Sequence, residues 1–231
     1  RRRKCKSAES TNREGLNYAS LTKSTDFSWT LDNLIYYNRT IGKHDFGFTF
    51  LQTATKYEYE ANNMSGEGIP LESSLWNAFK SLSSLKCWES SLTEKQLLSY
   101  MARMNYTYKG RYMLTASVRR DGASQLADGH KWATFPSVSL GWTISNEKFM
   151  EGLTWLYYLK LRAGYGVTGV IVGDSYNSLT RYEYGSPYFY DNGVWHQGLS
   201  VKSNPNPDLK WETSKEFNIG LDWAVLDERL S

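Results

Sequence analysis

The chain has 231 residues and a formal net charge of +3, with 27 Lys and Arg against 24 Asp and Glu. These charges are interspersed rather than gathered into a stripe, which argues against a nucleic-acid-binding surface. A mean hydropathy of -0.56 and the lack of any long apolar run exclude membrane-spanning helices.

Residues 1–15 are basic and show no apolar periodicity. We treat them as an unpatterned leader and expect one folded portion to cover residues 16–231. The chain lacks a charged segment followed by an apolar stretch, so no signal peptide is predicted.

The first pair of strands is predicted at residues 27–37 and 45–57. In both runs large apolar side chains occupy alternate positions, and residues 40–43 between them suit a turn. The two runs therefore predict a long hairpin. A short piece at residues 16–21 is a further candidate strand.

Residues 58–95 lose this alternation and are predicted to form a large loop. Within the loop, residues 70–79 place apolar side chains at helical spacing. This spacing predicts a short helix.

Residues 97–142 are the most regular stretch of the chain. Apolar side chains occupy every second position in three successive runs, at 98–108, 112–119 and 136–144. Each run is therefore a two-faced β-strand. Each is roughly 9 to 11 residues long, which exceeds the ~5 to 6 residues usual in soluble sheets and suits a tilted strand that crosses a bilayer.

The connections between these runs alternate in length. Lys109 and Gly110 form a minimal turn, whereas residues 121–133 form a long loop rich in Gly and Asp. Short turns on one side and long loops on the other are typical of outer-membrane β-barrels. We expect Leu114 and Val118 to face lipid and the polar side chains of the opposite parity to face the lumen.

The last third of the chain continues this pattern. A single helical turn is expected at 146–155, strands at 157–165 and 211–225, a glycine-rich loop at 166–173, a weaker strand at 176–184, and an irregular segment at 186–208 with a candidate strand near 194–201. The chain thus offers roughly eight to ten strands. We predict an all-β, antiparallel transmembrane β-barrel portion with long extracellular loops and short periplasmic turns.

Motifs that carry chemistry are scarce. His44, His130 and His196 lack companions at metal-ligand spacing, and Cys5 and Cys87 make neither a disulfide framework nor a metal pattern. Two free thiols are favoured, with a periplasmic disulfide as the alternative. Asp and Glu lie in loops or alternate on strand faces, which indicates a solvated lumen rather than a hydrolase with paired carboxylates. We expect no enzymatic activity, no metal and no cofactor.

Aromatic residues in the expected loops are the candidates for substrate contact, because their rings can stack on sugar rings. Packing within the loops is the alternative role for each. The candidates are Trp76, Tyr182, Tyr184, Tyr188, Tyr190 and Trp195, and the preferred set is Trp76, Tyr188, Tyr190 and Trp195.

Several blocks of the sequence resemble one known family when taken together. The blocks are residues 99–106, 119–124, 135–137 with Gly141, Trp142 and Glu147, 159–169, 206–212 and 218–222. In this order they resemble the SusC/RagA family, the TonB-linked outer-membrane receptors of Bacteroidota. The likeness runs from about Phe27 to the end of the chain and does not reach residues 1–15. It departs at Val170, where Asn is usual, and at Gln125 and Leu126, where Arg-Phe is common.

The resemblance implies a 22-stranded barrel of which this chain is a middle-to-late portion. The signal peptide, plug domain, TonB box, early strands and last strands would then lie outside this sequence. Family members import oligosaccharides, and some import peptides. A SusD-like surface lipoprotein acts as their lid, and TonB supplies the energy. The expected location is the outer membrane, with its lipid as a further partner.

Two other classes of function fit parts of the sequence. A passive porin-like or structural barrel would share the strands, and only the family blocks argue against it. A soluble all-β carbohydrate-binding module or glycosidase would use the aromatic residues, but its outward strand faces should be polar. Here one parity is apolar on strand after strand, which favours the transporter.

Overall fold

The computed structural model of the chain describes residues 2–6, 17–68, 79, 81–153, 155–190 and 193–225. β-Strands dominate these ranges, and no helix within them is long and apolar enough to cross a bilayer. The helix expected at 70–79 lies outside the described residues except for Phe79, and Trp76 lies outside them as well.

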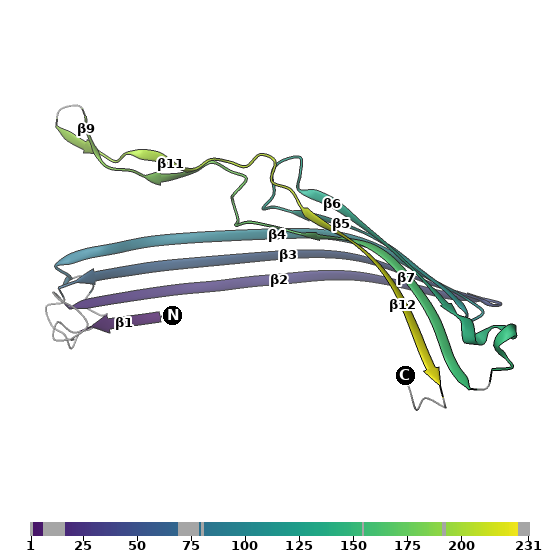
Figure 1. Ribbon diagram of the computed structural model, residues 1–231. Coiled ribbons are helices and arrows are strands. Elements are labelled where there is room, and N and C mark those ends of the chain that lie inside the picture. The colour runs from purple at the N-terminus through teal and green to yellow at the C-terminus, as the bar shows by residue number, and fades with distance from the viewer. Residues whose placement is uncertain are drawn as a thin grey trace. The chain divides into compact units, whose positions relative to one another are not determined.

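Eight strands form one sheet in the order β1-β2-β3-β4-β5-β6-β7-β12 (Figure 1). The strands are β1 (Arg2–Lys6), β2 (Tyr18–Ile41), β3 (His44–Glu67), β4 (Ser84–Tyr108), β5 (Tyr112–Ala123), β6 (Trp132–Thr143), β7 (Leu156–Val170), β8 (Arg181–Tyr184), β9 (Tyr188–Tyr190), β10 (Val194–His196), β11 (Leu199–Ser203) and β12 (Glu212–Val225). β8 pairs with β11, and β9 with β10, in two separate ribbons. The 3-10 helices η2 (Ile144–Asn146) and η3 (Lys148–Met150) follow β6, where one helical turn was predicted. The antiparallel, all-β fold is confirmed.

The first of two compact units comprises Arg1–Trp29 and Lys56–Lys95. Polar side chains join its strands. Thr22 Oγ1 on β2 donates to Asn63 Oδ1 on β3 over 3.1 Å, and Lys56 Nζ on β3 lies 3.0 Å from a carboxylate oxygen on β4. These pairs, added to the backbone ladder, stabilise strands that have little apolar alternation.

The prediction of a large loop at residues 58–95 is wrong. β3 continues to Glu67 and β4 already begins at Ser84, so only residues 68–83 connect them. The prediction failed because it relied on apolar alternation. A strand held by its backbone ladder and by polar pairs does not need an apolar face, so it leaves no such signal.

The second unit comprises Thr30–Thr55 and Gln96–Ser231, and its central strands share a continuous register. One row of cross-strand partners is Met104, Ala116, Val138, Tyr165 and Phe217, and the next row is Arg103, Ser117, Ser137, Gly166 and Glu216. Partners in an antiparallel sheet point to the same face, so successive rows lie on opposite faces. This confirms the two-faced strands that the sequence predicted in this part of the chain.

The turn between β4 and β5 has the geometry that its sequence requires. Lys109 and Gly110 have left-handed φ angles of 52° and 64°, and the Arg111 amide donates to the Tyr108 carbonyl over 3.0 Å. Residues 109–111 thus close the hairpin between the paired Tyr108 and Tyr112. Glycine adopts left-handed φ values without steric cost. The Lys109 amide also donates to the Lys43 carbonyl over 2.8 Å, which joins this turn to the turn between β2 and β3.

Near the amino end the structure contains more strand than the sequence predicted. Residues 2–6 of the expected unpatterned leader form β1 and pair with β2. The candidate strand at 16–21 is the start of β2, from Tyr18 onward. The loop expected at 121–133 is shorter, because β5 reaches Ala123 and β6 begins at Trp132.

The glycine-rich loop and the segment after it also differ from the predictions. β7 continues to Val170 because Gly166 and Gly169 keep their backbone pairing with β12. The weaker strand expected at 176–184 is reduced to β8, which lies outside the main sheet. The irregular segment at 186–208 contains β9, which was not predicted, and β10 and β11, which fall on the candidate strand near 194–201.

Two adjacent positions on β5 test the assignment of faces. Ala116 lies in the apolar row and Ser117 in the polar row. In the full-length protein folded into lipid vesicles, Ala116→Arg should cost about 2–4 kcal/mol, because the guanidinium enters hydrocarbon near the midplane, and Ser117→Arg should be mild. Urea titration of the two variants measures both penalties. Equal penalties would contradict the assignment.

Candidate functional site

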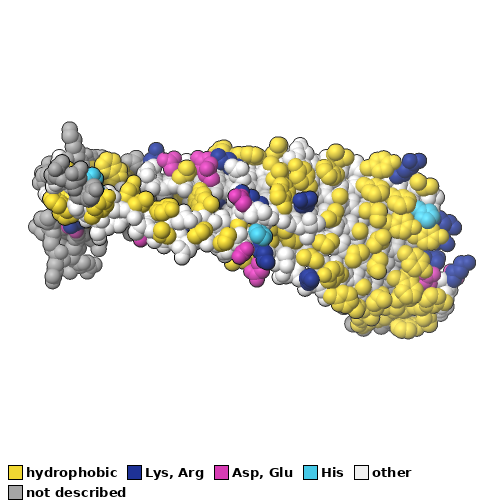
Figure 2. Space-filling model, turned by 90° about the horizontal axis from the view of Figure 1, so that it is seen from above, with side chains coloured by type: hydrophobic (Ala, Val, Ile, Leu, Met, Phe, Trp, Pro, Cys, Tyr) yellow, Lys and Arg dark blue, Asp and Glu magenta, His cyan; other side chains and the backbone are white. Residues whose placement is uncertain are grey.

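One face of the sheet in the second unit, which we call the apolar face, carries large exposed side chains. They include Ile35, Tyr37, Phe48, Phe50, Val118, Val138, Leu140, Tyr165, Phe217, Ile219 and Leu221. Figure 2 shows hydrophobic side chains gathered over the end of the sheet that carries the short turns, with Lys and Arg at the edge. Soluble monomers rarely expose contiguous apolar patches above a few hundred Å². A surface of this kind is suited to contact with lipid.

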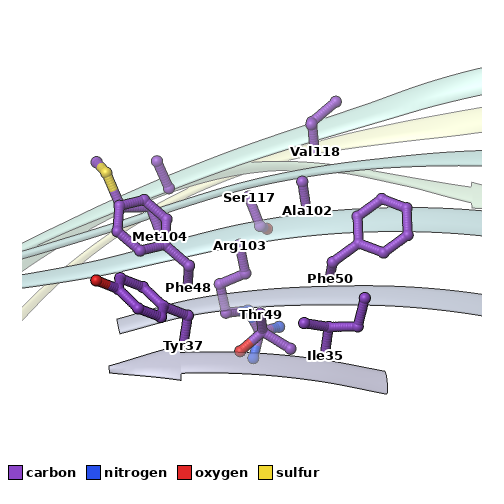
Figure 3. A pocket seen from close by; sticks show the side chains of 11 residues that line it. Ile35, Tyr37, Phe48, Thr49, Phe50, Ala102, Arg103, Met104, Ser117 and Val118 are labelled. Carbon is purple, nitrogen blue, oxygen red and sulfur yellow. The ribbon is translucent and has the colours of Figure 1, made fainter. Parts of the chain in front are cut away.

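A groove of about 460 Å³ on this face shows how the two sides of the strands differ. Ile35, Tyr37, Phe48 and Met104 project to the same side of β2, β3 and β4, whereas Arg103 projects to the other side (Figure 3). The Phe48 ring is tilted by 33° against the Tyr37 ring, with centroids 6.3 Å apart. The large apolar side chains that line the groove thus lie on the apolar face.

Two groups of aromatic side chains bound the apolar face. Near the short turns Tyr108 stacks on Tyr112, and Tyr112 on Trp142, with centroids 6.3 Å apart in both pairs. Toward the long loops Tyr100 stacks on Trp132 at 6.3 Å. From Tyr100 to Tyr108 the strand rises roughly 27 Å at ~3.4 Å per residue, or about 20 Å across a bilayer at a tilt of ~40°. This matches the apolar band of an outer-membrane barrel, which is about 25 Å tall.

Glu147, between η2 and η3, ties the connection after β6 to the aromatic group near the short turns. Its carboxylate accepts hydrogen bonds from the Tyr112 hydroxyl (2.6 Å), Trp142 Nε1 (3.2 Å) and Arg111 (3.0 Å). The Tyr112 hydrogen bond, supported by Trp142 and Arg111 and opposed by desolvation, lowers the pKa of Glu147. The carboxylate thus stays charged at neutral pH and holds the connection against the sheet.

The opposite face, which we call the polar face, is covered by hydrogen-bonded side chains. Thr115 Oγ1 donates to Asn105 Oδ1 over 3.0 Å, and Arg162 donates to Asp222 over 2.7 Å. Ser117 and its register partner are joined by a 2.7 Å hydroxyl contact. The residues predicted to face the lumen fall on this face by register: Arg103, Arg119, Lys160, Arg162, Glu212 and Glu216.

The polar face includes an ion pair in which the aspartate is buried and the arginine is partly exposed. Arg119 Nε donates to both carboxylate oxygens of Asp121, at 2.8 and 2.9 Å, and its Nη2 donates to Ser99 at 3.1 Å. Ser99 is 1% exposed and Asp121 is 8% exposed. The pairing satisfies charges that would be costly to bury alone. Both residues belong to the block at residues 119–124 that resembles the family, and the ion pair gives this block a structural role.

The His and Cys side chains in the described part of the chain are dispersed. No group of three His, Cys, Asp or Glu side chains there lies close enough to hold a metal ion. His44 Nδ1 lies 2.8 Å from the Tyr106 hydroxyl. Cys87 is a free thiol, and its Sγ accepts a hydrogen bond from Asn63 at 3.5 Å. The side chain of Cys5 lies outside the described atoms.

The long connections that follow β5 and β7 pack around a small buried core. Leu126 is 1% exposed and Ala127 is 4% exposed. The Ala127 amide donates to the Leu209 carbonyl over 3.0 Å, and Trp211 Nε1 donates to the Lys131 carbonyl over 3.0 Å. This core fixes the loop after β5 to the segment just before β12. Leu126 is also a position where the family resemblance departs, and an apolar side chain fills the core there.

An aromatic contact over glycine extends this core. The Phe135 ring packs edge-on against Trp211, with centroids 5.4 Å apart. A Cβ at Gly169 would lie within 2.1 Å of the same ring, so only glycine leaves room for it. This contact explains why a glycine is needed in a stretch that was predicted from the sequence to be a glycine-rich loop.

The aromatic substrate-contact candidates do not form one platform. Tyr182 and Tyr184 lie on β8 and are 60% and 80% exposed. Tyr188 lies on β9, where its register partner is His196, whereas Trp195 on β10 pairs with Phe189. Tyr188 and Trp195 therefore project from opposite faces of the β9–β10 ribbon. Tyr190 lies on β9 with its side chain outside the described atoms, and the stacking role of all these residues stays a prediction.

Apolar partners of the two exposed tyrosines on β8 were missed by the sequence analysis. Leu199 pairs with Tyr184, and Val201 with Tyr182. Leu199 is 66% exposed and Val201 is 52% exposed. They alternate with polar residues in a run of only five, and the Pro, Asn and Gly around them masked this signal. The β8–β11 ribbon thus presents a mixed aliphatic and aromatic face.

Comparison with known proteins decides the family. The profile described as "TonB dependent receptor-like, beta-barrel" matches residues 4–231. The chain belongs to this family. It is 32% identical over 212 residues to TonB-dependent receptor P39 of Formosa agariphila and 31% identical over 215 residues to TonB-dependent receptor SusC of Bacteroides thetaiotaomicron, with 90% of this chain covered in both cases. These matches confirm the SusC/RagA resemblance, and the receptor profile also includes residues 4–15, which that resemblance did not reach.

Solved structures of this receptor family share the fold. The chain superposes on a structure of the RagAB peptide transporter with a TM-score of 0.81, at 28% identity over 93% of its length. A second structure, of the RagAB peptide importer in the 'open-open' state, gives the same TM-score. The chain spans 20% of the two curated relatives and 23% of the solved chains. The receptor's barrel wall is thus shown, and the activity of the whole receptor is a matter for proposal.

The buried loop core gives a direct test of loop anchoring. In the full-length receptor, Leu126→Ala should destabilise the packed loops by about 2–5 kcal/mol, because it leaves a cavity in a filled site. Limited proteolysis should then cut the segment between β7 and β12 faster. The matched control is Leu179→Ala, at a leucine that is 56% exposed, and it should leave the rate unchanged. Equal rates in both variants would contradict the anchoring role.

Proposed function

We propose that this chain forms part of the barrel wall of a TonB-dependent importer in the outer membrane of a Bacteroidota-type bacterium. The observation that carries the proposal is a sheet with one exposed apolar face and one hydrogen-bonded polar face, in a chain of a receptor family. In this arrangement the apolar face contacts lipid. The polar face lines a water-filled lumen that substrate crosses.

Connection length sets the orientation that we propose. Residues 42–43 and 109–110 are tight turns at one end of the strands, where residues 144–155 form a longer connection with two helical turns. Residues 124–131 and the much longer 171–211 connect the strands at the other end. Outer-membrane barrels have short periplasmic turns and long extracellular loops. The loop core around Leu126 and the two ribbons are therefore extracellular, and the Glu147 contacts are periplasmic.

The import cycle that we propose uses parts outside this sequence. TonB would act on a plug domain within the barrel, and a SusD-like lipoprotein would cover the extracellular loops. The family membership supports both partners, since SusC and RagAB relatives match the chain over nine-tenths of its length. A passive porin-like or structural barrel would share the strands but not this family relationship.

An oligosaccharide is the substrate class that we favour. Tyr182, Tyr184 and Trp195 are exposed aromatic side chains on the ribbons before β12, and such rings stack on sugar faces. A peptide is the second candidate, because the solved relatives are described as a peptide transporter and importer. A soluble carbohydrate-binding module would also use these rings, but it would not expose the apolar face of the main sheet.

The aromatic role is tested by two exposed tryptophans, one on the β9–β10 ribbon and one in the connection just before β7. Trp195 is 65% exposed and Trp155 is 57% exposed. In the purified full-length receptor, Trp195→Ala should weaken oligosaccharide binding about two- to tenfold, since one ring stack contributes roughly 0.5–1.5 kcal/mol. Trp155→Ala should bind like wild type. Calorimetry against panels of neutral oligosaccharides and short peptides measures this.

Each outcome of this comparison discriminates between the candidates. Binding of peptides alone, weakened by Trp195→Ala, would replace the oligosaccharide by the second candidate. Oligosaccharide binding that is unchanged by Trp195→Ala would remove this residue from the site.

A further inference from the structure

Two lysines lie together at the rim of the short turns. The hydrogen bond from the Lys109 amide to the Lys43 carbonyl, 2.8 Å long, holds the two turns side by side, and both side chains are exposed. Lys109 Nζ lies 5.1 Å from the centroid of the Tyr108 ring. Within the described ranges, no carboxylate forms an ion pair with either lysine. By contrast, the nearby Arg111 is neutralised by Glu147 at 3.0 Å.

An apolar groove begins next to these lysines. It has a volume of about 420 Å³, and its lining side chains on the apolar face are Tyr106, Tyr112, Leu114, Leu140, Trp142, Leu161 and Ala163. Its depth comes from the small side chain of Ala163, which lies in register with Leu140 on β6. Tyr112 connects groove and rim, because its ring stacks on Tyr108, the ring that Lys109 approaches.

The groove and the rim together have the chemistry of an amphipathic ligand. The groove accepts an apolar chain, the aromatic rings suit the boundary between hydrocarbon and water, and two lysines without an acidic partner offer positive charge at the mouth. A phosphate-bearing lipid has this order of groups along its length. In Figure 2 the Lys and Arg side chains at this end border the hydrophobic area directly.

We propose that this rim is a binding site for an anionic phospholipid of the periplasmic leaflet. Its headgroup lies between Lys43 and Lys109, and one acyl chain occupies the groove that ends at Ala163. The inference rests on the proposed outer-membrane placement and adds a lipid site to it. Lysines that merely extend to the membrane surface would also attract anionic headgroups, but retention by them would not depend on the groove. Dependence on both the lysines and the groove therefore makes the proposal testable.

Native mass spectrometry tests the site by measuring which phospholipids the receptor retains. The full-length receptor is reconstituted in vesicles of phosphatidylglycerol and phosphatidylcholine, extracted with mild detergent, and its retained lipids are identified. Wild type should keep phosphatidylglycerol in preference to phosphatidylcholine. The variant Lys43→Gln with Lys109→Gln should lose about fivefold of this preference for each lysine at low salt. The control is Lys23→Gln with Lys210→Gln, two exposed lysines away from the short turns, and it should match wild type.

A second variant tests the groove without changing any charge. Ala163→Phe fills it, so less phosphatidylglycerol should be retained although both lysines remain. Equal retention of the two lipids by wild type, or wild-type behaviour of the double lysine variant, would overturn the site. Unchanged retention in Ala163→Phe would overturn the acyl-chain position.

Membrane insertion is followed separately, by the heat-dependent migration of folded barrels on gels. A receptor that fails to insert would contradict the proposed function. An inserted receptor without lipid preference would contradict only the lipid site.

Discussion

The structure depends on the pairing of every backbone amide and carbonyl between neighbouring strands. In a bilayer an unpaired group costs several kcal/mol because no water reaches it. β4 and β5 meet this requirement through an unbroken register from Leu97 paired with Ala123 to Tyr108 paired with Tyr112. β7 and β12 do so from Glu212 paired with Val170 to Ala224 paired with Tyr158. With the ladder satisfied, side chains are free to differ on the two faces.

Because of this ladder, alternating apolar and polar side chains form one apolar face and one polar face of the sheet. Rows such as Met104, Ala116 and Val138 expose apolar side chains, while the adjacent row with Ser117 and Ser137 is hydrogen-bonded. The aromatic groups at Tyr100 and at Tyr108 mark where the apolar band ends. Glu147 and the core around Leu126 then fasten the connections at the two ends. The function proposed for the chain, a wall between lipid and a water-filled lumen, follows from these parts together.

The sequence predicted those strands in which apolar and polar side chains alternate. β5 and β6 were located because Leu114 and Leu140 alternate with polar neighbours, and the Lys109-Gly110 turn because it is the short break between two alternating runs. The second half of β3 was missed because the strand is polar on both faces there. Its side chains, such as Asn63 and Glu58, pair through hydrogen bonds. These pairings depend on partners distant in sequence.

The candidate site also has features that the sequence predicted and features that it did not. The two faces could be assigned from periodicity, and the role of Glu147 was visible only as part of a family block. The core around Leu126 joins residues about 80 positions apart, as the Trp211 to Lys131 hydrogen bond shows, and no local pattern encodes it. The separation of Tyr188 from Trp195 depends on the register of a three-residue ribbon. A register this short is set by its turn rather than by a hydrophobic pattern.

The most direct test of the proposal that this chain forms a wall in the outer membrane is to determine, in whole cells, on which side of the membrane each connection lies. In the full-length receptor with Cys5 and Cys87 replaced by Ser, a single cysteine is placed at Ser186, before β9, or at Glu151, after η3; both positions are exposed. A membrane-impermeant maleimide should label the Ser186→Cys receptor on intact cells, and the Glu151→Cys receptor only after the outer membrane is permeabilised. Labelling of Glu151→Cys alone on intact cells would contradict the account, and so would equal labelling of both.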